Sequence, residues 1–315
     1  MSKIKKLTKQ KFDEIIKQNL LEDGFDSTSF SDQLSGKFYD TYYSKASFDQ
    51  FVADMRANYP EHYRKYAGDP NVTHNKGGQG GELVEKKGRY GYVPPKMASV
   101  ASSSRFCYLA LKDGTDVLLP DRVVKKEEVE FEKECQIWKD SSTAPQLDAY
   151  ISDERMDYYI EAKCHEIFDV HKIELKNKYW NIFEADNSFK KAIVGVEKGK
   201  EKFVLARTVF GLSDKQTRFD VKQFICHLLG IAQQSKGKNA KLVYLFFKPL
   251  AKEEAISKEI DLIFAELKEE IKAIFSCSII REFCEENQIE LEAIAEESSV
   301  MEKLNKMNVR NILHD

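Results

Sequence analysis

The sequence predicts an α/β fold in which a central mixed β-sheet is flanked by helices. Residues 145–151 and 158–164 alternate apolar and polar side chains, as half-buried strands do. Residues 241–247, Lys-Leu-Val-Tyr-Leu-Phe-Phe, form a run that is typical of a buried strand. Residues 252–275 repeat their apolar positions with the period of a helix, which predicts an amphipathic helix covering the sheet.

The composition is that of a globular protein with a sizeable core. The chain has 315 residues, 42% of them hydrophobic, and no internal repeat or linker rich in proline or serine divides it. Lysine and arginine (49) nearly balance aspartate and glutamate (52), so a net charge of -3 provides no overall attraction for nucleic acid. A DNA-binding surface would therefore have to be a local cluster of basic residues.

Membrane and zinc-binding classes are disfavoured. No apolar run approaches the ~20 residues of a membrane span, and no signal-type apolar segment follows the first residues, so we expect a cytoplasmic protein without membrane partners. The six cysteines have neither Cys-x-x-Cys nor zinc-type spacing, and we expect buried free thiols.

Helices are predicted on both sides of the strands. Residues 8–23 carry an apolar stripe between the cap Thr8 and the stop Gly24. Further helices are expected at 47–59, 97–112 and 221–232, partly packed helices at 169–200, a strand at 202–209, and one or two helices at 286–312. Nearly half of the glycines lie between residues 68 and 91, which predicts a flexible loop, and this segment lacks the Gly-Lys-Ser/Thr ending of a P-loop.

Two carboxylates and an ammonium group are expected on one side of the sheet. If residues 145–151 and 158–164 pair as a hairpin through 152–157, Asp148, Glu161 and Lys163 project from the same face. Mg²⁺ takes oxygen ligands and is commonly bound by one or two carboxylates together with substrate phosphate. A lysine two residues from a ligand can act as a point charge on the phosphate or the attacking water. The pattern therefore indicates a metal site for a phosphate-containing substrate.

The motif Pro145-Gln-Leu-Asp148, followed by Glu161-Ala-Lys163, resembles the PD-(D/E)XK nuclease superfamily, although the proline and aspartate are not adjacent here. The resemblance covers residues 97–250 and implies a restriction-endonuclease-like core. It also implies that Asp148 and Glu161 hold one or two Mg²⁺ ions, and that Lys163 stabilises charge on the phosphate or positions the water.

Superfamily members commonly carry a further acidic residue upstream of the aspartate. By resemblance Glu132 is the first choice for this catalytic and metal-binding role, and Glu134 is the second. Residues 129–137 fit either a strand or a helix, and we prefer a strand for the second half because it leads into the turn before Asp148. In several branches a glutamine on the helix after the Glu-x-Lys strand points back to the site, and Gln223 resembles that residue.

The resemblance implies a magnesium-dependent endonuclease that hydrolyses double-stranded DNA. The absence of helicase and ATPase motifs favours a type II restriction endonuclease, for which a homodimer is a further expectation. The alternatives are a nuclease of structured DNA or RNA in repair, and a non-catalytic nucleic-acid-binding module with the same fold. The expected parts are a helical N-terminal part with the glycine-rich loop at 1–96, packed on the core, the nuclease core at 97–250 and C-terminal helices at 251–315.

Overall fold

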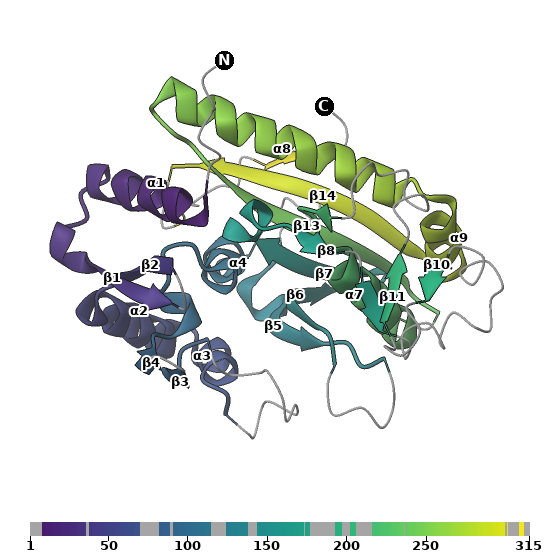
Figure 1. Ribbon diagram of the computed structural model, residues 1–315. Coiled ribbons are helices and arrows are strands. Elements are labelled where there is room, and N and C mark those ends of the chain that lie inside the picture. The colour runs from purple at the N-terminus through teal and green to yellow at the C-terminus, as the bar shows by residue number, and fades with distance from the viewer. Residues whose placement is uncertain are drawn as a thin grey trace, which may run out of the picture.

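A mixed six-stranded β-sheet forms the centre of the protein, as seen in a computed structural model (Figure 1). The structure describes residues 8–35, 38–69, 82–88, 91–114, 124–137, 144–172, 174–176, 193–196, 202–205, 216–235, 237–299, 301 and 309–311. The strand order is β15 (Val309–Asn311), β14 (Ile289–Ser298), β13 (Asn239–Pro249), β7 (Met156–Lys163), β6 (Gln146–Ser152) and β5 (Val129–Glu134). β13 runs parallel to both β7 and β14, and the remaining neighbours are antiparallel. The α/β class and the mixed sheet predicted from the sequence are therefore confirmed.

Helices cover both faces of this sheet. The described helices are α1 (Lys9–Glu22), α2 (Lys45–Asn58), α3 (Pro60–Tyr66), α4 (Ser103–Leu111), α7 (Val221–Gln234), α8 (Glu254–Phe275) and α9 (Ser278–Glu286). On one face, α7 packs Phe224 near Tyr244 of β13, and α8 places Phe264 beneath the ammonium of Lys248. On the other face, α4 packs Phe106 against Phe247, because successive residues of a strand point to opposite sides. Figure 1 shows α8 running along β13 and β14.

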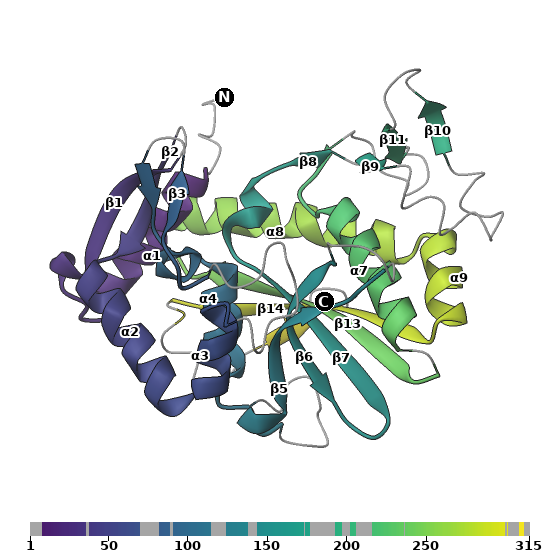
Figure 2. The ribbon, with the colours of Figure 1, turned by 90° about the horizontal axis from the view of Figure 1, so that it is seen from below.

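The N-terminal part packs against the sheet through α3 on β5 and through α1 at the ends of β13 and β14, and it is not purely helical. It also contains the hairpins β1 (Phe30–Ser35) with β2 (Phe38–Tyr43) and β3 (Lys86–Gly88) with β4 (Gly91–Val93). Figures 1 and 2 show α1, α2, α3 and these hairpins gathered at one end of the molecule. Tyr66 of α3 and Tyr108 of α4 contact Phe131 of β5, with ring centroids 5.6 and 5.7 Å away. This part and the sheet therefore share one hydrophobic core.

Several helices agree with the expectations from the sequence. Thr8 caps α1 by accepting a hydrogen bond from the Lys11 backbone, and Asp220 caps α7 in the same way through Gln223. The helix expected at 97–112 is shorter, because the Ser102 side chain accepts from the Arg105 backbone and thereby fixes the start of α4 at residue 103.

The expectation of helices at 286–312 is wrong for most of the described part. β14 occupies the interior of the sheet, where its whole length pairs in parallel with residues 240–249 of β13. Ile289, Leu291, Ala293 and Ala295 alternate with mostly charged residues, a period of two that the high glutamate and alanine content obscured. In its described residues, the part at 251–315 contains α8 and α9 followed by the strands β14 and β15, and these strands belong to the central sheet.

Residues 169–200 also differ from the helices expected there, as far as the structure describes them. They contain β8 (His171–Lys172), β9 (Glu174–Lys176) and β10 (Ile193–Val196). β9 and β10 both pair with β11 (Lys202–Leu205), which confirms part of the strand expected at 202–209, while β8 pairs with β12 (Gln216–Thr217). The aromatic residues at 179–183 lie outside the described residues, as do 70–81 of the glycine-rich segment.

Two expectations drawn from composition can be compared with the described residues. All six cysteines are free and buried, as predicted. In the portion of the chain described by the structure, no helix combines the length and the apolar character needed to cross a bilayer.

Candidate functional site

The predicted hairpin is formed by β6 and β7, and it brings Asp148 and Glu161 to the same level of the sheet. Ala149 pairs with Ile160, so Asp148, one residue earlier on β6, lies across from Glu161, one residue later on β7. One carboxylate oxygen of Asp148 accepts a hydrogen bond of 2.8 Å from the Ala162 backbone, which fixes its orientation toward β7. The two carboxylates therefore project from neighbouring strands on one face.

Glu161, Lys163 and Gln223 form a closed set of hydrogen bonds. The Lys163 ammonium donates to Glu161 Oε1 at 2.6 Å and to Gln223 Oε1 at 2.8 Å. The amide nitrogen of Gln223 donates to the same Glu161 oxygen at 2.8 Å. Gln223 lies in the first turn of α7, where the cap Asp220 fixes the start of the helix. Gln223 therefore points back to the Glu-x-Lys strand, which is the orientation that the resemblance implied.

His227, one turn after Gln223, is a neutral residue with both ring nitrogens engaged. Its Nε2 lies 3.1 Å from the carbonyl oxygen of Gln146, and a carbonyl only accepts, so Nε2 carries the proton. Burial lowers the pKa of His227, so Nδ1 is unprotonated and accepts from the Tyr244 hydroxyl at 3.2 Å. Glu161 Oε2 is 3.8 Å from Nε2, beyond hydrogen-bonding distance. His227 thus holds β6, α7 and β13 together.

The pKa of Asp148 and that of Lys163 are both raised in the site. Burial and the carboxylate of Glu161 raise the pKa of Asp148 well above its ordinary value. Burial lowers the pKa of Lys163, but the carboxylates of Glu161, Glu166 and Asp148 outweigh this and raise it overall. Lys163 is therefore a permanent cation near neutral pH, while Asp148 holds its proton more tightly than an exposed aspartate.

Glu132 lies beside this pair, on β5. Phe131 pairs with Ala149 on β6, which places Glu132, the next residue, level with Asp148. The backbone of Glu132 has φ of +53°, in the left-handed region that non-glycine residues rarely adopt, so its side chain departs from the alternation of the strand. Glu134, the second choice from the sequence, lies two residues farther along β5 and away from that level.

The kink at Glu132 also corrects the expected faces of β5. The sequence pattern placed Lys133 on the face of Phe131 and Glu130 on the opposite face. Instead, Lys133 donates to Glu130 at 2.7 Å, and its ammonium lies 4.1 Å from the ring centroid of Tyr150 on β6. A left-handed residue between two regular pairs turns the following side chain to the other side of the strand.

Glu82 is a further buried acid of this region, and the sequence reasoning missed it. Burial and the charge of Glu82 raise the pKa of Glu132 well above its ordinary value, with Asp148 acting in the same direction. Glu82 itself accepts from the ammonium of Lys96 at 2.8 Å, while only 2% of its surface is exposed. Glu82 directly follows the glycine-rich segment, and no local pattern there marks it as part of a site.

Glu166, which follows the motif, supports the strand end. Its carboxylate accepts from the Cys164 backbone at 2.7 Å. Burial raises the pKa of Glu166, but the charges of His165 and Lys163 and the backbone hydrogen bond outweigh it, so the pKa is lowered overall. Glu166 therefore adds a negative charge close to Lys163 and contributes to its raised pKa.

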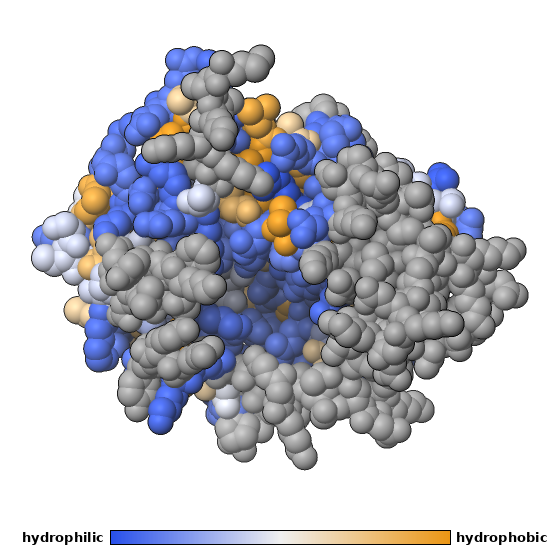
Figure 3. All heavy atoms as spheres, in the orientation of Figure 1, coloured by the Kyte–Doolittle hydropathy of each residue, from blue (hydrophilic) through white to orange (hydrophobic). Residues whose placement is uncertain are grey.

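The carboxylate oxygens of the site suit a hard cation, but hydrogen bonds within the protein already engage some of them. Among the residues that the structure describes, no three histidine, cysteine, aspartate or glutamate side chains converge in a geometry that would hold a metal ion. Lys163 occupies the nearest position to Glu161 Oε1. In the space-filling view, hydrophilic side chains line a hollow over the region where Figure 1 places β5 and β6 (Figure 3). Asp148 and Lys163 are only partly buried, unlike Glu161.

Comparison of the chain with protein-family models, with curated proteins and with solved structures gives no match. The functional argument therefore depends on the geometry described above.

Proposed function

We propose that this protein is a magnesium-dependent nuclease that hydrolyses phosphodiester bonds of double-stranded DNA, of the type II restriction endonuclease kind. The observation that carries the proposal is that Asp148 and Glu161 lie at one level of a mixed sheet, with Lys163 hydrogen bonded to Glu161 and Gln223 hydrogen bonded to both Glu161 and Lys163. Two carboxylates with a neighbouring lysine are the oxygen ligands and the point charge that magnesium-assisted phosphoryl hydrolysis requires.

The donor chemistry of the site fits Mg²⁺. Asp148 and Glu161 supply carboxylate oxygens, and Glu132 lies level with Asp148 on the neighbouring strand. When bound, Mg²⁺ would polarise the phosphate and increase the acidity of a bound water. Because the pKa of Asp148 and that of Glu132 are raised, these groups must lose protons before they can act as ligands, and metal binding is expected to be stronger at higher pH.

The residues of the chain have separate roles in the proposed reaction. Lys163 keeps its proton, so it acts as a fixed positive charge on the phosphate rather than as a base. Gln223 holds Glu161 and Lys163 in one orientation through its two hydrogen bonds. His227 supports this arrangement from α7 but is not the general base, because its unprotonated Nδ1 already accepts from the Tyr244 hydroxyl and its Nε2 proton is donated to the Gln146 carbonyl.

A second candidate is a non-catalytic nucleic-acid-binding module. The observation in its favour is that Lys163 already neutralises Glu161 at 2.6 Å, as a structural ion pair does. In that case the carboxylates would contribute to stability alone. A homodimer with one site for each DNA strand belongs to the nuclease proposal and not to this alternative.

DNA cleavage distinguishes the two candidates. Purified protein should convert plasmid and long linear DNA to discrete fragments in Mg²⁺ and not in EDTA, and Glu161→Gln should lose this activity. Glu290→Gln is a matched control, because this exposed glutamate on β14 pairs with Lys241 away from the site. A smear of products or a preference for branched DNA or RNA would favour a structure-directed nuclease. Metal-independent DNA binding without any cleavage would favour the module.

A further inference from the structure

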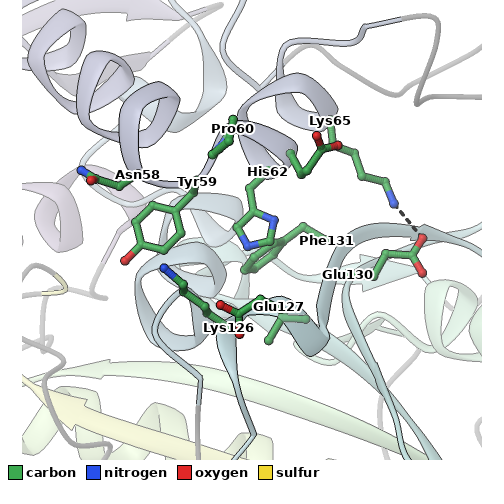
Figure 4. Close-up of a pocket in the computed structure, with 11 residues that line it drawn as sticks. Asn58, Tyr59, Pro60, His62, Lys65, Lys126, Glu127, Glu130 and Phe131 are labelled. Carbon is green, nitrogen blue, oxygen red and sulfur yellow. Dashed lines mark hydrogen bonds and ion pairs between the residues drawn. The ribbon is translucent and has the colours of Figure 1, made fainter.

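A cavity of about 420 Å³ lies outside the acidic site, between the start of α3 and the short helix η3 (Lys126–Glu128). Figure 4 shows Tyr59 and His62 extending from the α2–α3 side toward Lys126, with Phe131 of β5 behind His62. This volume falls within the range of small-molecule binding sites. The cavity is next to the acidic site in the chain, because Phe131 directly precedes Glu132.

One wall of the cavity is a continuous row of aromatic rings. Tyr59 and His62 are almost parallel, with an angle of 9° between the rings and 5.9 Å between their centroids. His62 in turn meets Phe131 edge to face, at a centroid distance of 4.7 Å. Burial lowers the pKa of His62, with Lys65 acting in the same direction, so the imidazole is neutral near pH 7. Tyr59 and His62 keep part of their surface exposed, unlike the fully buried aromatic residues of the core.

The remaining lining groups are polar and of both signs. Lys65 is paired with Glu130 at 2.8 Å and is therefore neutralised. Lys126 lies 5.4 Å from the ring centroid of Tyr59, opposite the acidic Glu127 in the same short helix. Such a lining does not select a strongly charged ligand. It offers hydrogen-bond donors and acceptors beside an aromatic wall, which suits a neutral planar ring with polar edges.

We propose that this cavity, formed by Tyr59, His62, Phe131 and Lys126, binds a nucleobase. The base would stack against the Tyr59–His62 wall and place its polar edge toward Lys126 and Glu127. The volume leaves room for an attached sugar, so the base can belong to a free nucleotide or to a nucleotide displaced from a duplex. Naming DNA as the source depends on the proposed nuclease function, whereas the binding of a base does not.

Fluorescence of 2-aminopurine tests this inference without catalysis. Metal-free protein in EDTA is titrated into the free 2-aminopurine nucleotide and, separately, into duplex DNA that carries 2-aminopurine opposite a mismatched base. Stacking on the aromatic wall should change the fluorescence and give a saturable binding curve. Binding of the DNA probe alone would identify a displaced base, and binding of the nucleotide alone would identify a free nucleotide. Binding of neither probe would refute the proposal.

Variants assign the binding to the cavity. Tyr59→Ala and His62→Ala should each weaken binding by about fivefold or more, since base–aromatic stacking is worth ~1–3 kcal/mol. Tyr59→Phe, which keeps the ring, should bind within about twofold of the parent. Tyr63→Ala is the matched control, because Tyr63 lies on α3 next to His62, does not line the cavity and carries Arg56 over its ring. Equal binding by the Tyr59→Ala, His62→Ala and Tyr63→Ala variants would overturn the proposal.

Two further readouts keep the outcomes separate. If the alanine variants do not fold, a nucleoside added to the parent protein should shift the His62 ring resonances in a proton NMR spectrum, and unchanged resonances would refute the proposal. Cleavage is measured independently. Base binding without Mg²⁺-dependent cleavage would contradict the nuclease proposal and support base binding in the cavity. Cleavage together with unaltered base binding in the variants would support the nuclease proposal and contradict base binding in the cavity.

Discussion

Replacing Asp148 by asparagine should stabilise the metal-free protein at neutral and alkaline pH. The amide oxygen of asparagine can still accept the hydrogen bond from the Ala162 backbone, so this contact remains. The change removes a carboxylate whose pKa is raised by burial and by Glu161. A carboxyl with a raised folded pKa contributes stability below its unfolded pKa, and that contribution is lost as the pH rises through the folded value. The parent protein should therefore become less stable than the variant as the pH increases.

The size of this effect follows from linkage. Each unit by which folding raises a pKa corresponds to about 1.4 kcal/mol, and solvent near the partly buried Asp148 reduces the interaction. We expect Asp148→Asn to increase the free energy of unfolding by ~1 kcal/mol or more at pH 8 in EDTA, with little difference at pH 4. This gain corresponds to a rise in Tm of about 2–4 °C for each kcal/mol.

Thermal unfolding at pH 4, 6 and 8, in EDTA and in Mg²⁺, measures these differences. Mg²⁺ at a hundred times its Kd should stabilise the parent by ~2.7 kcal/mol and the variant much less. Asp157→Asn, on the same hairpin, is a control for which we expect the opposite change in stability. Burial raises the pKa of Asp157, but hydrogen bonds from Lys238, Ser152 and Tyr150 outweigh it and lower the pKa overall.

The control variant should be destabilised by about 1.5–3 kcal/mol at neutral pH, because the change weakens bonds to a charged acceptor. That loss should disappear as the pH falls through the folded pKa of Asp157, where the parent carboxylate is also protonated. If Asp148→Asn instead lowers the stability at pH 8, or if Mg²⁺ stabilises both proteins equally, the carboxylate of Asp148 is a structural partner and the metal-site argument is refuted.

Three other changes examine separate parts of the molecule. Lys163→Met should reduce cleavage by about a hundredfold or more without weakening Mg²⁺ binding in calorimetry, and weaker binding would contradict its role as a charge on the phosphate. Gln223→Leu removes the hydrogen bond that Gln223 donates to Glu161 and the one that it accepts from Lys163, and it should weaken Mg²⁺ affinity by about 10–100-fold, whereas unchanged affinity would show that these bonds are dispensable. Gly230→Ala should destabilise the protein by about 1–3 kcal/mol in urea unfolding, because a Cβ there would lie 2.6 Å from the Cys135 carbonyl, and an unchanged midpoint would contradict that close packing.

The hairpin could be predicted because the residues that determine it are close together in the sequence. Leu147, Ala149 and Ile151 point inward and are fully buried, as their spacing of two residues indicates, and the turn at 152–157 leaves one compact pairing. The strand expected at 241–247 is present as β13, and its buried character agrees with its place inside the sheet between β7 and β14. Once the two strands are paired in this register, Asp148 and Glu161 necessarily lie opposite each other on β6 and β7.

What the sequence did not reveal depends on contacts between distant residues. Glu82 is close enough to Glu132 to raise its pKa, and it also pairs with Lys96, but nothing in the glycine-rich neighbourhood distinguishes it from a solvated glutamate. The left-handed backbone of Glu132 has no marker, because glutamate is not a residue that favours that conformation. β14 was mistaken for a helix because its glutamates and alanines are poor strand formers, and pairing with β13 overrides that preference.

The balance of charge favours a site for a divalent cation over a purely structural ion-pair network. Glu82, Glu132, Asp148 and Glu161 interact with one another or with the two ammonium groups of Lys96 and Lys163. His227 is neutral and adds no charge. If all four acids ionised, their negative charges, together with that of Glu166 beside Lys163, would exceed the two ammonium charges of these residues, which is costly away from water. The raised pKa values of Glu132 and Asp148 indicate that folding opposes that ionisation, and the positive charge of a divalent cation would favour it.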